Sequence, residues 1–221
     1  MACAVLDVDA KEGIPTAAEA ASQDHVLASD WGGGRSPFGV GWPKLMMWLF
    51  LIQDTLTFAG LLTGYGVIRL SLGRWPVQGE VFNLYLVGFM TFILICSSAT
   101  MAVAVAAARR GEGATVIRFL LLTVLGGLAF LGMQAYEWTH VIGEGARLFT
   151  NPWGVPLFSA SFFIITGFHG AHVSAGVIYL LITARRWARG RIQPESVEIA
   201  GLYWHFVDLV WVFIFTLLYL L

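Results

Sequence analysis

Five long apolar runs follow one another along this chain, and short polar connections separate them. A membrane-spanning helix needs about 20 mostly apolar residues to cross ~30 Å of hydrocarbon. The connections carry Gly, Pro, Asn and Ser, which are typical of turns. We therefore expect an all-α, polytopic membrane helix bundle with five transmembrane helices. The expected spans are residues 43–68, 82–108, 117–142, 156–183 and 199–221.

The residues before the first run have a different character. Residues 1–41 are rich in Ala, Gly and Asp, and they lack the charged start, apolar middle and cleavage site of a signal peptide. We interpret residues 1–41 as a flexible N-terminal tail and residues 42–221 as the five-helix transmembrane domain. Because so little chain lies outside the spans, any chemistry must take place within the bundle or at its edge.

Basic residues are distributed unequally between the two sides that alternate connections define. Cytoplasmic loops of membrane proteins carry an excess of Lys and Arg. The tail, the second connection and the fourth connection hold ten basic residues, and the other side holds three. This asymmetry predicts a cytoplasmic N-terminus and an external C-terminus. The ten are Lys11, Arg35, Lys44, Arg109, Arg110, Arg118, Arg185, Arg186, Arg189 and Arg191, and the three are Arg69, Arg74 and Arg147.

Composition supports a membrane protein and narrows its chemistry. The chain is 57% hydrophobic and only 12% charged, as expected of a protein surrounded by lipid. Thirteen basic and 14 acidic residues leave a formal net charge of -1, so no basic excess suggests nucleic acid as a partner. Cys3 lies in the tail and Cys96 in an apolar run, which is not the pattern of a disulfide or a metal site.

Seven acidic and histidine residues lie inside the predicted spans. A charged side chain at the bilayer centre costs ~2.5 to 3.5 kcal/mol on insertion scales, so such residues suggest function. Six of them form pairs spaced three residues apart, and this spacing places each pair on one helical face. We expect those faces to point into the bundle. The residues are Asp54, the pair Glu137 and His140, the pair His169 and His172, and the pair His205 and Asp208.

The helical rise of ~1.5 Å per residue allows their depths to be compared. Asp54 lies roughly 16 Å, and Asp208 roughly 14 Å, from the cytoplasmic ends of their spans. His169 lies about 10 Å from the same side. We therefore predict a polar cluster in the cytoplasmic half and a second polar pair, Glu137 and His140, toward the outer end. The cluster comprises Asp54, His169, His172, His205 and Asp208.

Three interpretations of these residues remain open. Acid and imidazole groups would lock helix orientations through mutual hydrogen bonds, since an unpaired buried polar group is costly. Alternatively, they would pass protons. In the third interpretation they would ligate a b-type haem, for which depth allows only His169 or His172 together with His205. A di-iron site needs more ligands than five histidines readily supply.

Four segments together resemble subunit III of the haem-copper respiratory oxidases. The runs EIAGLYWHFVDLVWVFIFTLLYLL and GFHGAHVSAGVIYLL carry the most specific similarity, through WHFVD and HGxHV. WLFLIQDTLTFAGLLTGYGVIR resembles the first helix of the five-helix bacterial form, and FLGMQAYEWTHVIGEG resembles its third. The resemblance covers residues 42–221. It implies a form that lacks the first two helices of the seven-helix version and has a cytoplasmic amino end.

The resemblance also implies roles for individual residues. Arg186 closes the fourth helix, where the family has an arginine that contacts lipid headgroups. Asp54 occupies a position where the cytochrome c branch commonly carries Glu, so it is more like the quinol-oxidising branch. The family's two intramembrane acids fall on Asp54 and Glu137, the HGxHV histidines on His169 and His172, and the WHFVD pair on His205 and Asp208.

The resemblance further implies a function next to a catalytic centre. Family members bind no haem or copper, and the redox centres lie in partner subunits. We expect a non-catalytic accessory subunit of a proton-pumping terminal oxidase that reduces O2 to water, in the bacterial cytoplasmic membrane. Its partners would be catalytic subunit I, subunit II and other small membrane subunits. It would stabilise the catalytic subunit, bind phospholipid and support proton uptake.

Two other functions remain open. One alternative is an accessory subunit of a nitric oxide reductase, which uses a related protein. Alternatively, the chain would be a stand-alone b-type haem quinone oxidoreductase. The resemblance itself implies no catalytic residue and no metal or cofactor site in this chain.

Overall fold

The computed structural model describes residues 41–221. The tail expected over residues 1–41 therefore lies outside the described residues, apart from Gly41. The chain divides into two units after Leu45. The second unit, Met46–Leu221, holds the helix bundle and every site described below.

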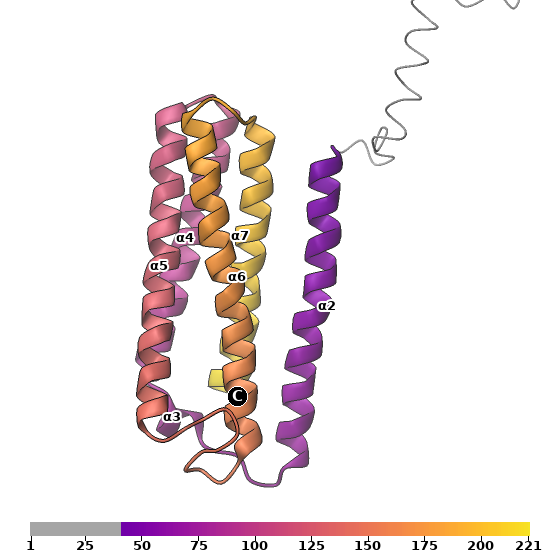
Figure 1. Ribbon diagram of the computed structural model, residues 1–221, viewed down its shortest axis with the longest axis vertical. Coiled ribbons are helices and arrows are strands. Elements are labelled where there is room, and N and C mark those ends of the chain that lie inside the picture. The colour runs from indigo at the N-terminus through magenta and orange to yellow at the C-terminus, as the bar shows by residue number, and fades with distance from the viewer. Residues whose placement is uncertain (1–40) are drawn as a thin grey trace, which may run out of the picture. The chain divides into compact units, whose positions relative to one another are not determined.

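Five helices are long and apolar enough to cross a membrane. The fifth of these, α7, continues without a break as the π-helix η1. A short helix, α3 (Gln78–Val81), lies between the first two spans. The described residues contain no strand, which confirms the predicted all-α fold with five transmembrane helices. The spans are α2 (Trp42–Ser71), α4 (Leu84–Arg109), α5 (Gly113–Gly143), α6 (Pro156–Ala188) and α7 (Pro194–Ile214) with η1 (Phe215–Leu220) (Figure 1).

Local sequence signals mark the helix ends. Pro156 and Pro194 begin α6 and α7, where the missing proline N–H removes no helical hydrogen bond. The Asn83 side chain accepts a hydrogen bond from the Leu86 amide at the start of α4, as an N-cap residue does. Gly111 and Gly190 follow α4 and α6 with φ of 75° and 63°, a conformation that glycine adopts without steric cost.

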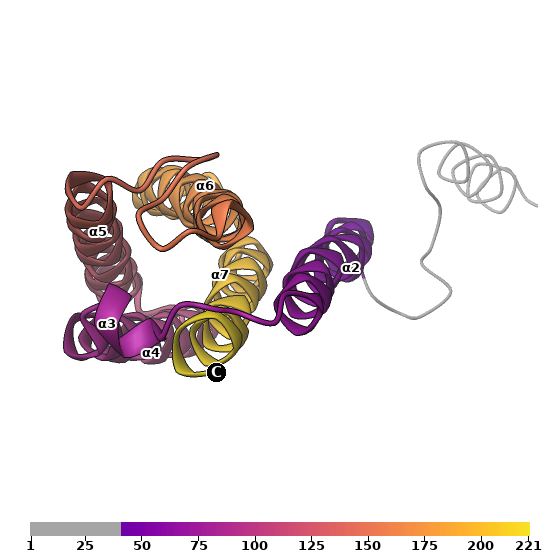
Figure 2. The ribbon, with the colours of Figure 1, turned by 90° about the horizontal axis from the view of Figure 1, so that it is seen from below.

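Helices α4 to α7 pack against one another around an aromatic and aliphatic core (Figure 2). Trp204 of α7 lies at the centre of this packing and is 1% exposed. Its indole donates a hydrogen bond to Ser97 Oγ of α4 at 3.1 Å. Gly127 of α5 and Gly176 of α6 both face its ring. Small residues at helix contacts allow this close approach in membrane proteins.

Only one side of helix α2 is buried, and few of its residues lie on that side. Its buried residues are Leu51, Asp54, Phe58 and Tyr65, whose spacing of three, four and seven keeps them on one side of the helix. That side faces α6 and α7, because Phe58 packs against Phe168 and Phe206. The other sides of α2 are apolar and exposed, as suits contact with lipid.

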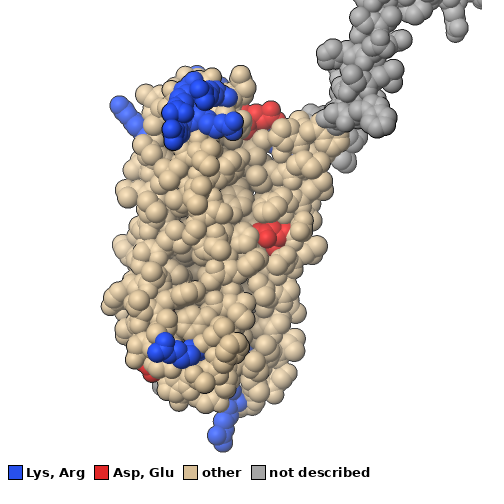
Figure 3. Space-filling model, in the orientation of Figure 1, with Lys and Arg blue, Asp and Glu red and all other residues tan. Residues whose placement is uncertain are grey.

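Charged side chains lie mainly at the two ends of the spans. Figure 3 shows basic side chains gathered at the end that carries the α4–α5 and α6–α7 connections. The basic residues of these connections and the adjoining helix ends are Arg109, Arg110, Arg118, Arg185, Arg186, Arg189 and Arg191. The opposite end carries Arg69, Arg74 and Arg147.

Candidate functional site

Asp54 and His172 meet between α2 and α6. The Asp54 carboxyl oxygen Oδ2 lies 3.2 Å from His172 Nε2. Both side chains are largely buried, with 11% and 17% of their surfaces exposed. The contact is close enough for charge pairing, but Asp54 Oδ2 accepts no hydrogen bond with proper direction. The pair is therefore a close polar contact and not a directed hydrogen bond.

The other ring nitrogen of His172 constrains where its protons can be. Nδ1 lies 2.8 Å from the carbonyl oxygen of Phe168. Since a carbonyl oxygen only accepts hydrogen bonds, Nδ1 must carry a hydrogen. A second proton can then lie on Nε2 or on the Asp54 carboxyl. The pair is arranged to hold that proton between an acid and an imidazole.

Aromatic side chains enclose this pair. The Phe58 ring lies 5.2 Å from the His172 ring, and the Phe168 ring lies 4.6 Å from it, both in edge-on orientations. Tyr203 of α7 donates a hydrogen bond to the His172 carbonyl oxygen at 3.0 Å. These contacts and the low exposure of both side chains leave little of the pair open to solvent.

His169 lies one turn from His172 but faces the interior of the α4–α7 bundle. Its ring stacks on Trp211 at 5.1 Å and meets the edge of Phe130 at 5.7 Å. The residue is 1% exposed, and neither ring nitrogen has a hydrogen-bond partner. His169 is thus a core histidine that packs as an aromatic ring.

His205 and Asp208 lie on a different side of α7. His205 Nδ1 is 2.6 Å from Ser98 Oγ of α4, and Asp208 follows one turn further along α7. His205 also lines a cavity of about 300 Å³ between α4 and α7, together with the ion pair of Arg109 and Glu198 at 3.0 Å. The five residues expected to form one cluster are therefore distributed over three separate environments.

Glu137 and His140 also have different partners. Glu137 is buried, and its Oε2 accepts hydrogen bonds from Gln134 Nε2 and from the Tyr219 hydroxyl, both at 2.8 Å. His140 has 58% of its side chain exposed, and its Nδ1 lies 3.6 Å from Glu144. The structure thus places the acid in the core and the histidine on the surface.

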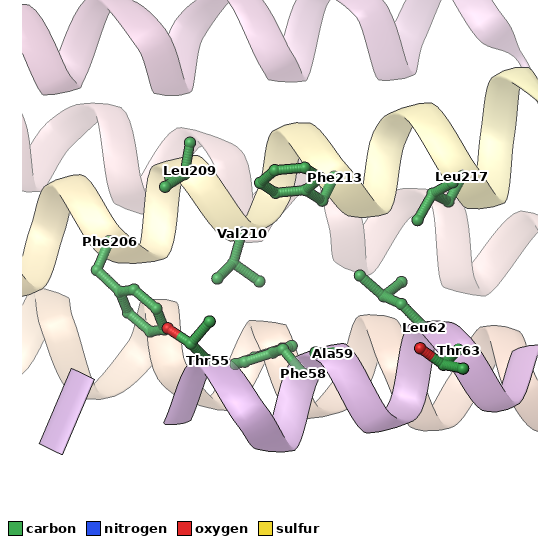
Figure 4. Close-up of a pocket in the computed structure, with 10 residues that line it drawn as sticks. All are labelled: Thr55, Phe58, Ala59, Leu62, Thr63, Phe206, Leu209, Val210, Phe213 and Leu217. Atoms are coloured by element: carbon green, nitrogen blue, oxygen red, sulfur yellow. The ribbon is translucent and has the colours of Figure 1, made fainter. Parts of the chain in front are cut away.

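An apolar groove of about 380 Å³ lies between α2 and α7, next to the Asp54–His172 pair. Figure 4 shows side chains of both helices lining it. Among the described residues that line it, only Thr55 and Thr63 have polar side chains, and the Thr55 hydroxyl already donates to the Leu51 carbonyl. The groove is suited to a hydrocarbon chain. The lining residues are Thr55, Phe58, Ala59, Leu62, Thr63, Phe206, Leu209, Val210, Phe213 and Leu217.

Arg186, the candidate headgroup contact, is exposed near the end of α6. It lies among the basic residues at that end of the spans, and no ion pair between described residues includes its side chain. A guanidinium in this position is available to a phosphate group.

Several partners in these sites were not predicted from the sequence. Ser98, Tyr203, Gln134 and Tyr219 all bond to a candidate residue. Gln134 alone had a local signal, because it lies one turn before Glu137. Within residues 41–221, no three His, Cys, Asp or Glu side chains lie together as metal ligands would.

Known proteins resemble this chain over most of its length. The family described as cytochrome c oxidase subunit III matches residues 23–221. Cytochrome bo(3) ubiquinol oxidase subunit 3 of Pseudomonas aeruginosa is 35% identical over 201 residues, which cover 90% of this chain and 90% of that protein. Quinol oxidase subunit 3 of Bacillus subtilis is 34% identical over 180 residues, or 80% of this chain and 86% of that protein.

A relative named as a cytochrome c oxidase subunit, and not as a quinol oxidase subunit, is similar to the same degree. Cytochrome c oxidase subunit 3 of Synechocystis is 38% identical over 189 residues, which cover 82% of this chain and 78% of that protein. These similarities confirm the resemblance that the WHFVD and HGxHV segments indicated. The chain belongs to the cytochrome c oxidase subunit III family and is an accessory subunit of a haem-copper terminal oxidase in the bacterial membrane.

Proposed function

We propose that this subunit stabilises catalytic subunit I of a proton-pumping oxidase, holds phospholipid beside it and supports its proton uptake. The haem and copper centres would lie in partner subunits, with subunit II and other small membrane subunits completing the complex. The observation that carries the proton role is the enclosed contact between Asp54 and His172 at 3.2 Å.

The Asp54–His172 pair has the properties of a proton-holding site. An acid and an imidazole share a place for one proton, because His172 Nδ1 is committed to the Phe168 carbonyl. Asp54 lies in the span α2 and His172 in the span α6. Ionisable residues inside membrane spans commonly serve proton transfer. Loss of the Asp54 carboxyl group would remove the acid that shares this proton with His172.

The α2–α7 groove supports the lipid role. Its volume and apolar lining match an acyl chain, and lipid entering between the two helices would lie beside Phe58 and Phe206. Arg186 would bind the phosphate of a headgroup at the basic end of the spans. Lipid held in this groove would also cover the aromatic rings that keep water from Asp54.

The basic end of the bundle supports a cytoplasmic orientation. Most described Arg residues gather at the α4–α5 and α6–α7 connections (Figure 3). Cytoplasmic segments of membrane proteins carry this excess. Since α2 runs away from that end, the N-terminus would be cytoplasmic and the C-terminus external.

The test of the proton role uses the purified oxidase complex carrying Asp54→Asn, with Glu144→Gln as the matched control. Glu144 is an exposed acid at the far end of α5 from the basic connections. The Asp54→Asn complex should assemble with its haem content intact, but take up protons more slowly or lose activity sooner during sustained turnover. Unchanged proton uptake together with an unchanged working lifetime would exclude the proton role.

The test of the lipid role fills the groove. Leu62→Trp places a large ring in it, whereas Leu56→Trp adds the same ring on an exposed part of α2. Native mass spectrometry of the complex should show fewer retained phospholipids for Leu62→Trp and an unchanged number for Leu56→Trp. Equal lipid retention in both variants would count against the groove as the binding site.

A further inference from the structure

Glu137 lies in a hydrogen-bonded site in which two buried oxygen atoms have no partner. Its Oε2 accepts two hydrogen bonds, from Gln134 Nε2 and from the Tyr219 hydroxyl. Its other oxygen, Oε1, is buried and has no partner. Gln134 Oε1 is likewise buried without a partner. Glu137, Gln134 and Tyr219 are 4%, 6% and 1% exposed, so bulk water reaches none of them freely.

The elements around Glu137 supply no compensating positive charge. No ion pair between described residues includes it. On its own helix, His140 is turned outward to Glu144. The titratable group that faces it from η1 is Tyr219, which donates to it. On α6, the titratable residue His169 packs against Phe130 and Trp211. Its ring nitrogens have no hydrogen-bond partner, so it does not bond to Glu137.

The remaining helix packed against α5 adds no charge either. In the half of α4 nearest Glu137, the titratable groups are Tyr85 and Cys96, and both are exposed on the outer surface of that helix. An ionised Glu137 would therefore be an unpaired charge in a span, about 9 Å from the end of α5 by helical rise. Such a charge is costly in hydrocarbon.

A single proton on Glu137 Oε1 would satisfy both unpaired oxygens. The protonated oxygen would donate to Gln134 Oε1, while Oε2, now the carbonyl oxygen of the acid, keeps its two donors. A carbonyl oxygen has two lone pairs and accommodates both. The carboxylic acid and the primary amide would then be joined by two antiparallel hydrogen bonds in one ring, with no charge left over.

We propose that Glu137, Gln134 and Tyr219 form a proton-binding site in which Glu137 carries one proton as a neutral carboxylic acid. The ligand of this site is a single proton. Tyr219 lies on η1, so the protonated site also fastens the π-helical end of the chain to α5. The site is separate from the Asp54–His172 pair and does not depend on the proposed proton-uptake role.

The experiment is infrared spectroscopy of the purified oxidase complex at neutral pH, as a difference between wild type and Glu137→Gln. We expect the wild type to show a protonated carboxylic C=O band that moves to lower frequency in D2O and is missing from the variant. Glu144→Gln is the control, because Glu144 is exposed and its removal should delete carboxylate bands only. Loss of carboxylate bands alone in Glu137→Gln would overturn the proposal.

Two further variants keep the test decisive if Glu137→Gln does not accumulate. Tyr219→Phe and Gln134→Leu each remove one donor to Oε2 and leave the acid in place. Each should move the protonated C=O band to higher frequency without abolishing it. Tyr85→Phe, at a residue 93% exposed, should leave it unchanged. If the frequency of the band is the same in Tyr219→Phe, Gln134→Leu and the wild type, Glu137 is not the acid observed.

Discussion

Trp204 occupies the space that Gly127 leaves open between α5 and α7. A Cβ atom on Gly127 would lie 2.5 Å from Cη2 of the Trp204 ring and 2.8 Å from Cγ2 of Val177. Both distances are shorter than real side-chain contacts. The Trp204 ring also faces Gly176 and is hydrogen-bonded to Ser97, so moving it away would disturb both contacts.

Gly127→Ala should therefore destabilise the bundle although alanine favours helices. Overpacking of a well-packed interior costs about 1–3 kcal/mol, which exceeds the gain of up to ~1 kcal/mol from replacing a helical glycine. Gly132→Ala on the same helix is the control, because its Cβ would meet nothing within 4 Å. Thermal unfolding of the purified subunit should show a lower midpoint for Gly127→Ala only. Equal midpoints would contradict the packing described here.

Thr91 anchors the other buried tryptophan of α7. Trp211 Nε1 donates to Thr91 Oγ1 at 3.0 Å, and both side chains are buried. Thr91→Val keeps the shape but leaves the indole N–H without an acceptor, which should cost about 1–2 kcal/mol. Thr57→Val changes an exposed threonine of α2 that bonds only to its own helix, and should have little effect. Thermal unfolding should show a lower midpoint for Thr91→Val only. An equal decrease of the midpoint in both variants would contradict the prediction.

The apolar runs predicted the helices well because length and hydrophobicity alone decide whether a segment can span a bilayer. The helices themselves extend past the apolar runs in places. Helix α6 continues to Ala188 instead of ending at 183, and α7 begins at Pro194 instead of 199. Backbone hydrogen bonding does not stop at the membrane surface, so hydropathy cannot locate these ends.

The site residues were harder to group because depth along a helix does not specify direction. Asp54 and Asp208 were expected at similar depths, yet Asp54 faces α6 while Asp208 lies beside His205, on the side of α7 that faces Ser98 of α4. Residues three apart also differ in direction by roughly 60°. At the border between the buried and the exposed side of α5, this difference is enough to bury Glu137 and expose His140. The Tyr219 partner, 82 residues away in sequence, leaves no local pattern to read.

Arg110 and Glu112 form an exposed pair in the α4–α5 connection. The guanidinium Nε and a terminal nitrogen of Arg110 donate to the two carboxylate oxygens of Glu112, and this contact lowers the pKa of Glu112 from its ordinary value. A carboxyl with a lowered folded-state pKa stabilises the fold above its unfolded pKa. That contribution is lost as the pH falls through the lowered value.

We expect the Glu112 carboxyl to titrate below an ordinary glutamate in an NMR titration of isotope-labelled subunit. Arg110→Gln should return it to the ordinary range. Arg109→Gln should not, because Arg109 pairs with Glu198. Added salt should shrink the shift, since exposed charges are screened. A Glu112 titration that is indifferent to Arg110→Gln would refute the assignment.

The orientation of the chain can be tested with single cysteines in exposed connections at opposite ends of the bundle. Gly73 lies between α2 and α3, and Gln193 lies between α6 and α7. Both are exposed. In a background with Cys3→Ser and Cys96→Ser, a membrane-impermeant thiol reagent applied to spheroplasts should label Gly73→Cys. Gln193→Cys should be labelled only in inverted vesicles, because the arginine-rich end faces the cytoplasm. The reverse pattern would invert the proposed orientation, and labelling of both from one side would contradict the five spans.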